Sequence, residues 1–242
     1  MPTFKTVTAV LAISLSLVTG SSAQNVTAKS DPKIQPEFDI VQATITTEAN
    51  WLTFKMQVSG KIGAAKPAPG GKLEGAKVFS YVWPTSLDSS VAGFDAKQGI
   101  LALAVAAHPD FDDTPLFDEN SDGKYDNDGG LWHSHWVVLV KDPGCGGGLK
   151  VKDIPKGAKP KLPRTWPGLP ILIDSPGYSP VIDASTVSVR VPFRATGALK
   201  GMKFDGVTSG LRVGATPHDK LLCVTDVFKV GSGNLSLPGR VQ

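Results

Sequence analysis

The sequence predicts an all-β protein, specifically an antiparallel β-sandwich with long loops. About nine segments of four to ten residues alternate apolar and polar side chains or form short apolar runs, as strands do. The chain contains 26 glycines and 19 prolines, which indicates frequent turns. Segments with a sustained helical period are lacking, and 41% hydrophobic residues are enough to build a core.

Residues 1–23 have the features of a secretory signal peptide. Lys5 precedes an apolar run over Val7–Val18, and small residues up to Ala23 offer a cleavage site. The run is too short for a membrane span, and no later segment approaches 18 uninterrupted apolar residues. We therefore expect cleavage near Ala23 and a secreted or periplasmic protein without a membrane span.

The mature chain is expected to form one domain. Residues 24–36 are polar and predict a disordered linker, and residues 37–242 predict a single sandwich with an acidic metal-binding insertion at 108–130. The expected sandwich is of the jelly-roll, immunoglobulin-like or carbohydrate-binding-module-like kind. The opening hairpin and the alternating closing strands resemble sandwich domains of the carbohydrate-binding and DOMON types. That resemblance implies a fold and carries no function with it.

The first two strands predict a hairpin. Phe38–Thr47 and Trp51–Ser59 alternate on either side of a Glu-Ala-Asn turn. Ile100–Ala107 is a continuous apolar run that periodicity assigns equally to a helix or a strand; its length and the breaker His108-Pro109 favour a buried strand. Further strands are expected at Lys77–Trp83, Trp132–Lys141, Ile171–Asp174, Thr186–Phe193, Leu211–Ala215 and Leu221–Val230.

Two cysteines in an exported chain predict a disulfide between Cys145 and Cys223. The alternatives are two buried thiols or a cysteine that binds a metal. Between them begins the lysine-rich loop 150–164, which either folds across the acidic segment or stays solvated. The net charge is only +3 and the lysines are dispersed, so nucleic acid is not an expected partner.

The acidic segment predicts a calcium site. Asp118-x-Asn120-x-Asp122-Gly123 has the spacing of the first half of an EF-hand loop. Lys124 would offer its carbonyl and Asp126 a water-mediated contact, but Gly129 replaces the usual bidentate glutamate. The pattern resembles the open loops of dockerins and thrombospondin type-3 repeats. A solvated acidic loop is the alternative, and the ligands that would complete the shell are Asp128 or one of Asp110, Asp112 and Asp113.

A transition-metal site is expected beside it. His133 and His135 are two residues apart on a predicted strand, so their imidazoles share one face and can chelate zinc or copper. The third ligand would be His108 or a nearby carboxylate, with His218 a remote candidate. The alternative is that both histidines are ordinary strand residues. Copper/zinc superoxide dismutases are similar in placing His-x-His on a strand shortly before a cysteine, but this chain lacks their further histidines.

Three functions follow from these patterns. The first is an exported metal-binding protein without catalysis, for storage, delivery or sensing, and no catalytic residue is assigned. The second is a carbohydrate-binding or cell-surface module with structural calcium. The third is a metal-dependent hydrolase or lyase in which Asp110, Asp112 or Asp113 is the general base. The sugar-stacking candidates of the second are Trp51, Trp83, Trp132, Trp136 and Trp166.

Overall fold

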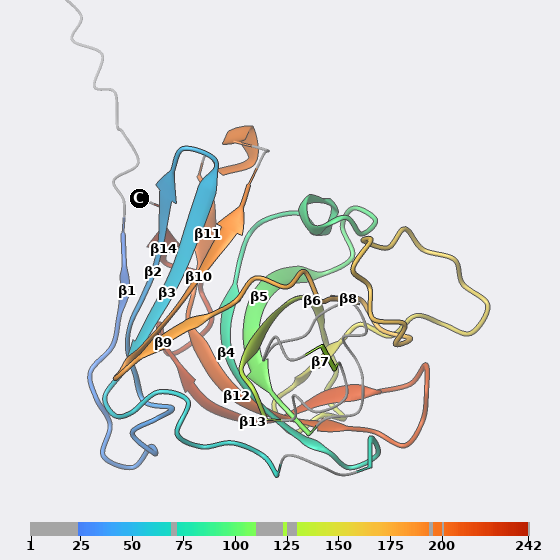
Figure 1. The fold of residues 1–242 in the computed structure, drawn as a ribbon, viewed down its shortest axis with the longest axis horizontal. Helices are drawn as coiled ribbons and strands as arrows, with labels where there is room; N and C mark the ends of the chain where they lie inside the picture. Colours follow the sequence, from blue (N-terminus) through green and yellow to red (C-terminus); the bar gives the residue numbers. More distant parts are fainter. Residues whose placement is uncertain are drawn as a thin grey trace, which may run out of the picture.

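The computed structural model describes residues 24–68, 72–109, 123–124, 130–193, 196–199 and 201–241. The chain is nearly all β, with 43% strand, 3% helix and antiparallel sheets, as the sequence predicts. A sandwich is not confirmed, because six strands close into a barrel, which is a different all-β architecture (Figure 1).

The structure has fourteen strands and two short 3-10 helices in the described part of the chain. Five of the predicted strands, from the opening hairpin to the histidine-bearing strand, begin and end within two residues of their predicted bounds. The strands are β1 Val26–Thr27, β2 Ile40–Glu48, β3 Trp51–Val58, β4 Lys77–Pro84, β5 Ile100–Ala107, β6 His133–Lys141, β7 Leu149–Val151, β8 Ile173–Asp174, β9 Val181–Asp183, β10 Thr186–Pro192, β11 Lys203–Phe204, β12 Val207–Val213, β13 Leu222–Val230 and β14 Gly239–Arg240; the 3-10 helices are η1 Ser89–Ala92 and η2 Thr196–Leu199.

The barrel runs in the order β5-β4-β12-β13-β7-β6 and is closed by pairing of β5 with β6. It forms the ring on the right of Figure 1. The short strand β8 also pairs with β6, next to β7. Closure removes the exposed edges that an open sheet would present, because β5 has a hydrogen-bonded neighbour on both sides.

A second sheet, in the order β1-β2-β3-β10-β9, lies beside the barrel (Figure 1). Its first strand falls in the segment 24–36 that was expected to be disordered. Strand β1 pairs with β2, and Val26 is buried there. Strands β11 and β14 form a separate two-stranded sheet.

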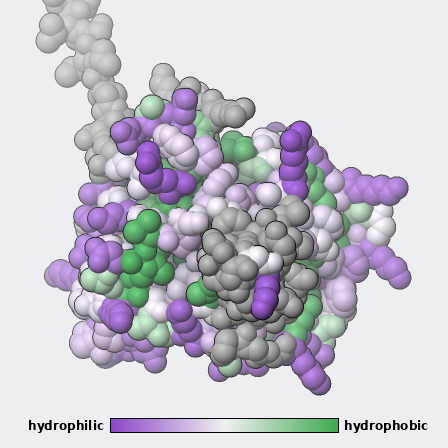
Figure 2. Space-filling view, viewed as in Figure 1, coloured by the Kyte–Doolittle hydropathy of each residue, from purple (hydrophilic) through white to green (hydrophobic). Residues whose placement is uncertain are grey.

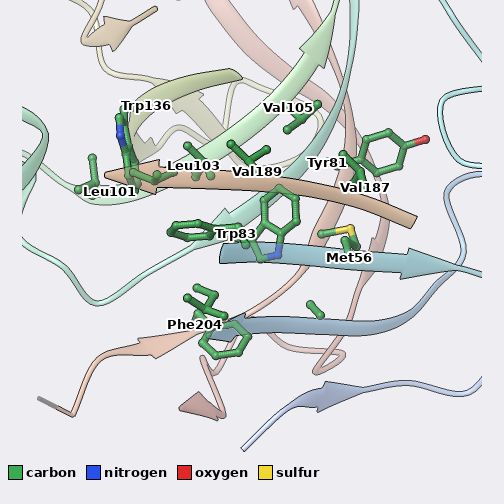
Figure 3. Close-up of a cluster of buried hydrophobic side chains, with 14 of the residues drawn as sticks. Met56, Tyr81, Trp83, Leu101, Leu103, Val105, Trp136, Val187, Val189 and Phe204 are labelled. Carbon is green, nitrogen blue, oxygen red and sulfur yellow. The ribbon is translucent and has the colours of Figure 1, made fainter. Parts of the chain in front are cut away.

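Strands β4, β5 and β6 of the barrel bury both faces, and their alternate residues enter two different hydrophobic clusters. The outer core lies between the barrel wall and the five-stranded sheet, and Figure 3 labels Trp83 and Trp136 among its side chains. Phe54 meets both tryptophans edge-on, with ring centroids 5.9 and 5.8 Å away. The inner core lies inside the barrel. Strand β5 shows the division: Leu101, Leu103 and Val105 belong to the outer core, and Ala102, Ala104 and Ala106 to the inner core.

Cys145 and Cys223 form the predicted disulfide, which joins the β6–β7 turn to β13. Near it Lys150 forms ion pairs with Asp142 at 3.2 Å and Asp153 at 2.8 Å. This lysine of the basic loop is therefore neutralised by local carboxylates. Hydrophilic side chains are spread over the face shown in Figure 2. In the described ranges, no helix is long and apolar enough to cross a membrane.

Candidate metal centre

Three histidines converge on the inner side of the barrel wall. His108 follows the last residue of β5, and His133 is the first residue of β6. The β5–β6 ladder sets His133 opposite Ala106 and His135 opposite Ala104, both of which face the inner core. The side-by-side pairing of β5 and β6 therefore brings His108 beside the pair that strand parity alone predicts. All three side chains are buried.

The spacing of the cluster suits one metal ion. One ligand nitrogen from each histidine lies within 4.8 Å of the others, and Nε2 of His108 is 3.0 Å from Nε2 of His133. Two nitrogens bound to the same tetrahedral zinc at about 2.0–2.1 Å would be separated by about 3.3 Å. Small rotations of the rings would therefore place all three nitrogens at bonding distance from one ion.

The Nδ1 atoms of the three rings are held by oxygen atoms. His108 Nδ1 lies 2.7 Å from the carbonyl oxygen of Pro109, and His133 Nδ1 lies 3.1 Å from that of Leu131. A carbonyl oxygen only accepts, so in both rings Nδ1 carries the proton and Nε2 carries the lone pair. Such an acceptor fixes ring orientation and makes the opposite nitrogen a better metal ligand.

The tautomers have an electrostatic consequence. With both Nδ1 atoms donating, the two Nε2 atoms that face each other at 3.0 Å are both acceptors whenever both rings are neutral. Two lone pairs at that distance repel, and the repulsion is larger in a buried site of low dielectric constant. A cation between the nitrogens, either a metal ion or a shared proton, removes it. The arrangement therefore favours a bound positive charge.

The third ring is positioned by strand β8. His135 Nδ1 lies 3.1 Å from the hydroxyl oxygen of Ser175, which directly follows β8. Because Trp136 pairs with Asp174, continuation of that ladder puts Ser175 opposite His135. Burial raises the pKa of Asp174 to about 6, although Thr165 Oγ1 donates a hydrogen bond of 2.6 Å to its carboxylate. The sequence predicts the strand at Ile171–Asp174, but neither Ser175 nor Asp174 is identified there as a site residue, because alternation does not reveal that this strand pairs with β6.

A cavity of about 280 Å³ adjoins the cluster inside the barrel. His108 and His135 line it together with side chains of the inner core. Small residues on the inward face of β5, Ala104 and Ala106, contribute to the space. An ion held by the three histidines would thus lie in the cavity wall. We call this space the inner cavity.

Other predicted ligands are placed differently. The Nδ1–H of His218 donates to the carbonyl oxygen of Ile154 at 2.5 Å, and His218 is not part of the three-histidine cluster. Of the expected calcium ligands, only Lys124 is described, and it is exposed. Gly123 has φ 85°, the left-handed conformation that a sharp turn requires. The remaining expected ligands lie outside the described residues: Asp110, Asp112, Asp113, Asp118, Asn120, Asp122, Asp126 and Asp128.

The exposure of the five tryptophans tests whether they could stack on a sugar ring. Trp83, Trp132 and Trp136 are buried, so their faces are not available to stack on a sugar ring. Trp51 is 40% exposed, and the Arg190 guanidinium carbon lies 4.9 Å from its ring centroid. Trp166 is half-buried and donates its indole N–H to the carbonyl oxygen of Leu169 at 2.9 Å.

Comparisons with protein-family models, with curated proteins and with solved structures found no match. The three-histidine cluster and the cavity beside it are the features of the described residues that bear most directly on function.

Proposed function

We propose that this chain is an exported metal-binding protein in which His108, His133 and His135 bind one zinc or copper ion. The observation that carries the proposal is the convergence of three buried imidazoles, two of them held by backbone carbonyls in the tautomer that directs Nε2 toward the others. Neutral imidazole nitrogen is a favoured ligand of both metals.

The set of three histidines suits an ion that also takes an exchangeable ligand. Structural zinc sites have four protein ligands, whereas sites with three protein ligands keep a position for water or another molecule. Here that position would face the inner cavity, because His108 and His135 both line it. This supports reversible binding of a ligand at the metal, as in a carrier or a sensor.

A metal-dependent hydrolase or lyase is the second candidate. The same exchangeable position would hold a metal-activated water, whose pKa is lowered to about 7 in established zinc enzymes. The residues expected to act as the base are Asp110, Asp112 and Asp113. The adjoining cavity favours this candidate over the carbohydrate-binding alternative, because a buried apolar space suits a molecule less polar than a sugar.

The acidic segment is proposed as a separate calcium site. Its support is the Asp118-x-Asn120-x-Asp122-Gly123 spacing, together with the left-handed backbone of Gly123. The test compares thermal melts with calcium and with chelator. Stabilisation by calcium should be lost in Asp122→Ala, and identical wild-type melts in both conditions would contradict calcium binding.

The test of the transition-metal site is titration calorimetry with zinc and with copper, after saturation with calcium. We expect one equivalent of metal to bind to the wild type, and His133→Ala/His135→Ala to weaken that binding at least about 100-fold, since each lost ligand removes a metal bond. His218→Ala is the matched control, because it removes a histidine outside the cluster. Equal affinity of wild type and double variant would refute the site.

A further inference from the structure

The inner cavity is almost uniformly apolar. Of its described lining residues, only four have polar side chains: Ser80, Ser209, His108 and His135. The two serine hydroxyls lie 2.8 Å apart across the β4–β12 ladder and hydrogen-bond to each other. The polar groups directed to a ligand are therefore concentrated at the histidines.

The cavity has a definite capacity. A cavity of 150 Å³ lined by aliphatic and aromatic side chains is known to hold one benzene molecule. The inner cavity, at about 280 Å³, is nearly twice that size. It would therefore take a molecule of about 10 to 14 non-hydrogen atoms. Two lining residues, Leu73 and Val227, are 37% and 40% exposed, so the cavity reaches the surface.

The electrostatics of the bound metal select the head group of such a molecule. A divalent ion held by three neutral imidazoles would keep a charge of about +2, and on its cavity side, where the wall is apolar, an anion beside it would stabilise it. An oxygen anion at the exchangeable position would offset that charge. The apolar walls would then hold the rest of the molecule.

We propose that the inner cavity binds an amphipathic carboxylate, with its hydrocarbon body inside the barrel and its carboxylate on the metal held by His108, His133 and His135. This inference rests on the proposed metal site and adds the class of ligand. It joins two observations and one expectation: the cavity is apolar, its polar lining is the histidines and a pair of serines that hydrogen-bond to each other, and a cation is expected at the histidines.

The direct experiment measures decanoate binding by titration calorimetry to the zinc-loaded full chain. Decanoate has twelve non-hydrogen atoms and fits the estimated capacity of about 10 to 14. We expect its affinity to be at least about tenfold higher with zinc than after chelation, because the carboxylate then has a metal partner. Acetate, which has the head without the chain, should bind at least about 100-fold more weakly than decanoate. Decanol, without the charge, should also bind more weakly.

A cavity-filling variant tests the place of binding. Val82 lines the inner cavity on β4, and Val82→Phe should weaken decanoate binding at least about tenfold while zinc affinity stays within about twofold. Arg212→Phe is the matched control, because Arg212 is exposed on the neighbouring strand β12. Val207→Leu, a smaller filling opposite Val82, gives a second variant if the phenylalanine prevents folding.

The outcomes separate the two proposals. If zinc binds but decanoate affinity is unchanged by chelation or by the cavity-filling variants, the proposed carboxylate ligand is wrong and the proposed metal site is retained. Failure of zinc to bind at the histidines would overturn both. Loss of decanoate binding in the filled variants and after chelation, with zinc affinity retained in the variants, is the result that supports the inference.

Discussion

The outer and inner cores meet at strands β4, β5 and β6, which contribute side chains to both, but they differ in what fills them. The outer core contains the large buried aromatic rings, among them Phe54, Trp83 and Trp136. The described residues of the inner core are aliphatic, and they leave a cavity of about 280 Å³. Since dense packing stabilises a fold and an open volume does not, the outer core is the stabilising one. The inner core is packed less densely, and the space that remains can hold a ligand.

Truncation of neighbouring residues on β4 should show the largest contrast. Trp83 is fully buried in the outer core, so Trp83→Ala should lower the free energy of unfolding by about 3–5 kcal/mol. Val82 faces the inner cavity, and Val82→Ala should cost only about 1 kcal/mol, because the valine already borders empty space. Denaturant titrations measure both values. Equal losses would show that the two cores contribute alike.

Removal of the disulfide should lower the free energy of unfolding, although neither cysteine belongs to the outer core. Cys145 and Cys223 are 78 residues apart. The loop-entropy model gives at most about 4–5 kcal/mol for Cys145→Ala/Cys223→Ala, and we expect a loss of about 2–4 kcal/mol, as is typical of single disulfides. Zinc binding should survive below the lowered melting temperature, because neither cysteine belongs to the histidine cluster. Unchanged stability of the double variant would contradict this contribution.

Zinc bound at the three histidines, which lie on the inner side of the barrel wall, should raise the stability of the folded protein. A ligand that binds only the native state adds about 2.7 kcal/mol at 100 times its dissociation constant. We expect zinc to raise the melting temperature of the wild type and of His218→Ala, and to leave that of His133→Ala/His135→Ala unchanged. Differential scanning calorimetry with and without zinc measures this. The same shift in all three proteins would place the zinc elsewhere.

The smallest expected effect comes from an ion pair between the sheet and the barrel. Asp39 precedes β2 and pairs with Lys229 of β13. Burial alone would raise the pKa of Asp39, but hydrogen bonds from Lys229, Ser30, Ser59 and the Asp31 backbone outweigh it and lower the pKa to about 2.

A lowered pKa means that the folded state favours the carboxylate. The stabilisation, about 2 kcal/mol, is therefore complete above the unfolded value near 4 and is lost as the pH falls through about 2. Asp39→Asn should be less stable than the wild type at pH 7, and the difference in unfolding free energy should shrink below pH 4. A difference that stays constant down to pH 2 would exclude this linkage.

Local patterns were sufficient for the five strands from β2 to β6 and for part of the site. Ile100–Ala107 was predicted with the bounds that the structure shows, and the parity of His133 and His135 correctly put both on one face. Strand β12 begins at Val207, earlier than predicted, because the polar pair Thr208-Ser209 and Gly210 obscure its alternation. At Gly210 an added Cβ would lie 3.2 Å from the Phe228 ring, so packing selects glycine within this strand.

Closure of the barrel could not be predicted from the sequence. It depends on pairing between strands such as β5 with β6 and β13 with β7, and alternation does not specify a strand's partner. The continuous apolar run of β5 did carry a signal, since a strand that is apolar on both sides must be covered on both sides. Ser175 was missed because its role follows from the β6–β8 ladder.

The positions of His108 and His133 give the metal site a mechanical consequence. The two residues are 25 apart in sequence and flank the acidic segment, and the Gly130 N–H donates to the His108 carbonyl oxygen at 2.8 Å. An ion bound to both imidazoles would act as a reversible cross-link at the base of that segment, resisting separation of β5 from β6. Any calcium held between these ends would then be thermodynamically linked to the zinc or copper, and each metal would change the affinity for the other by the same factor.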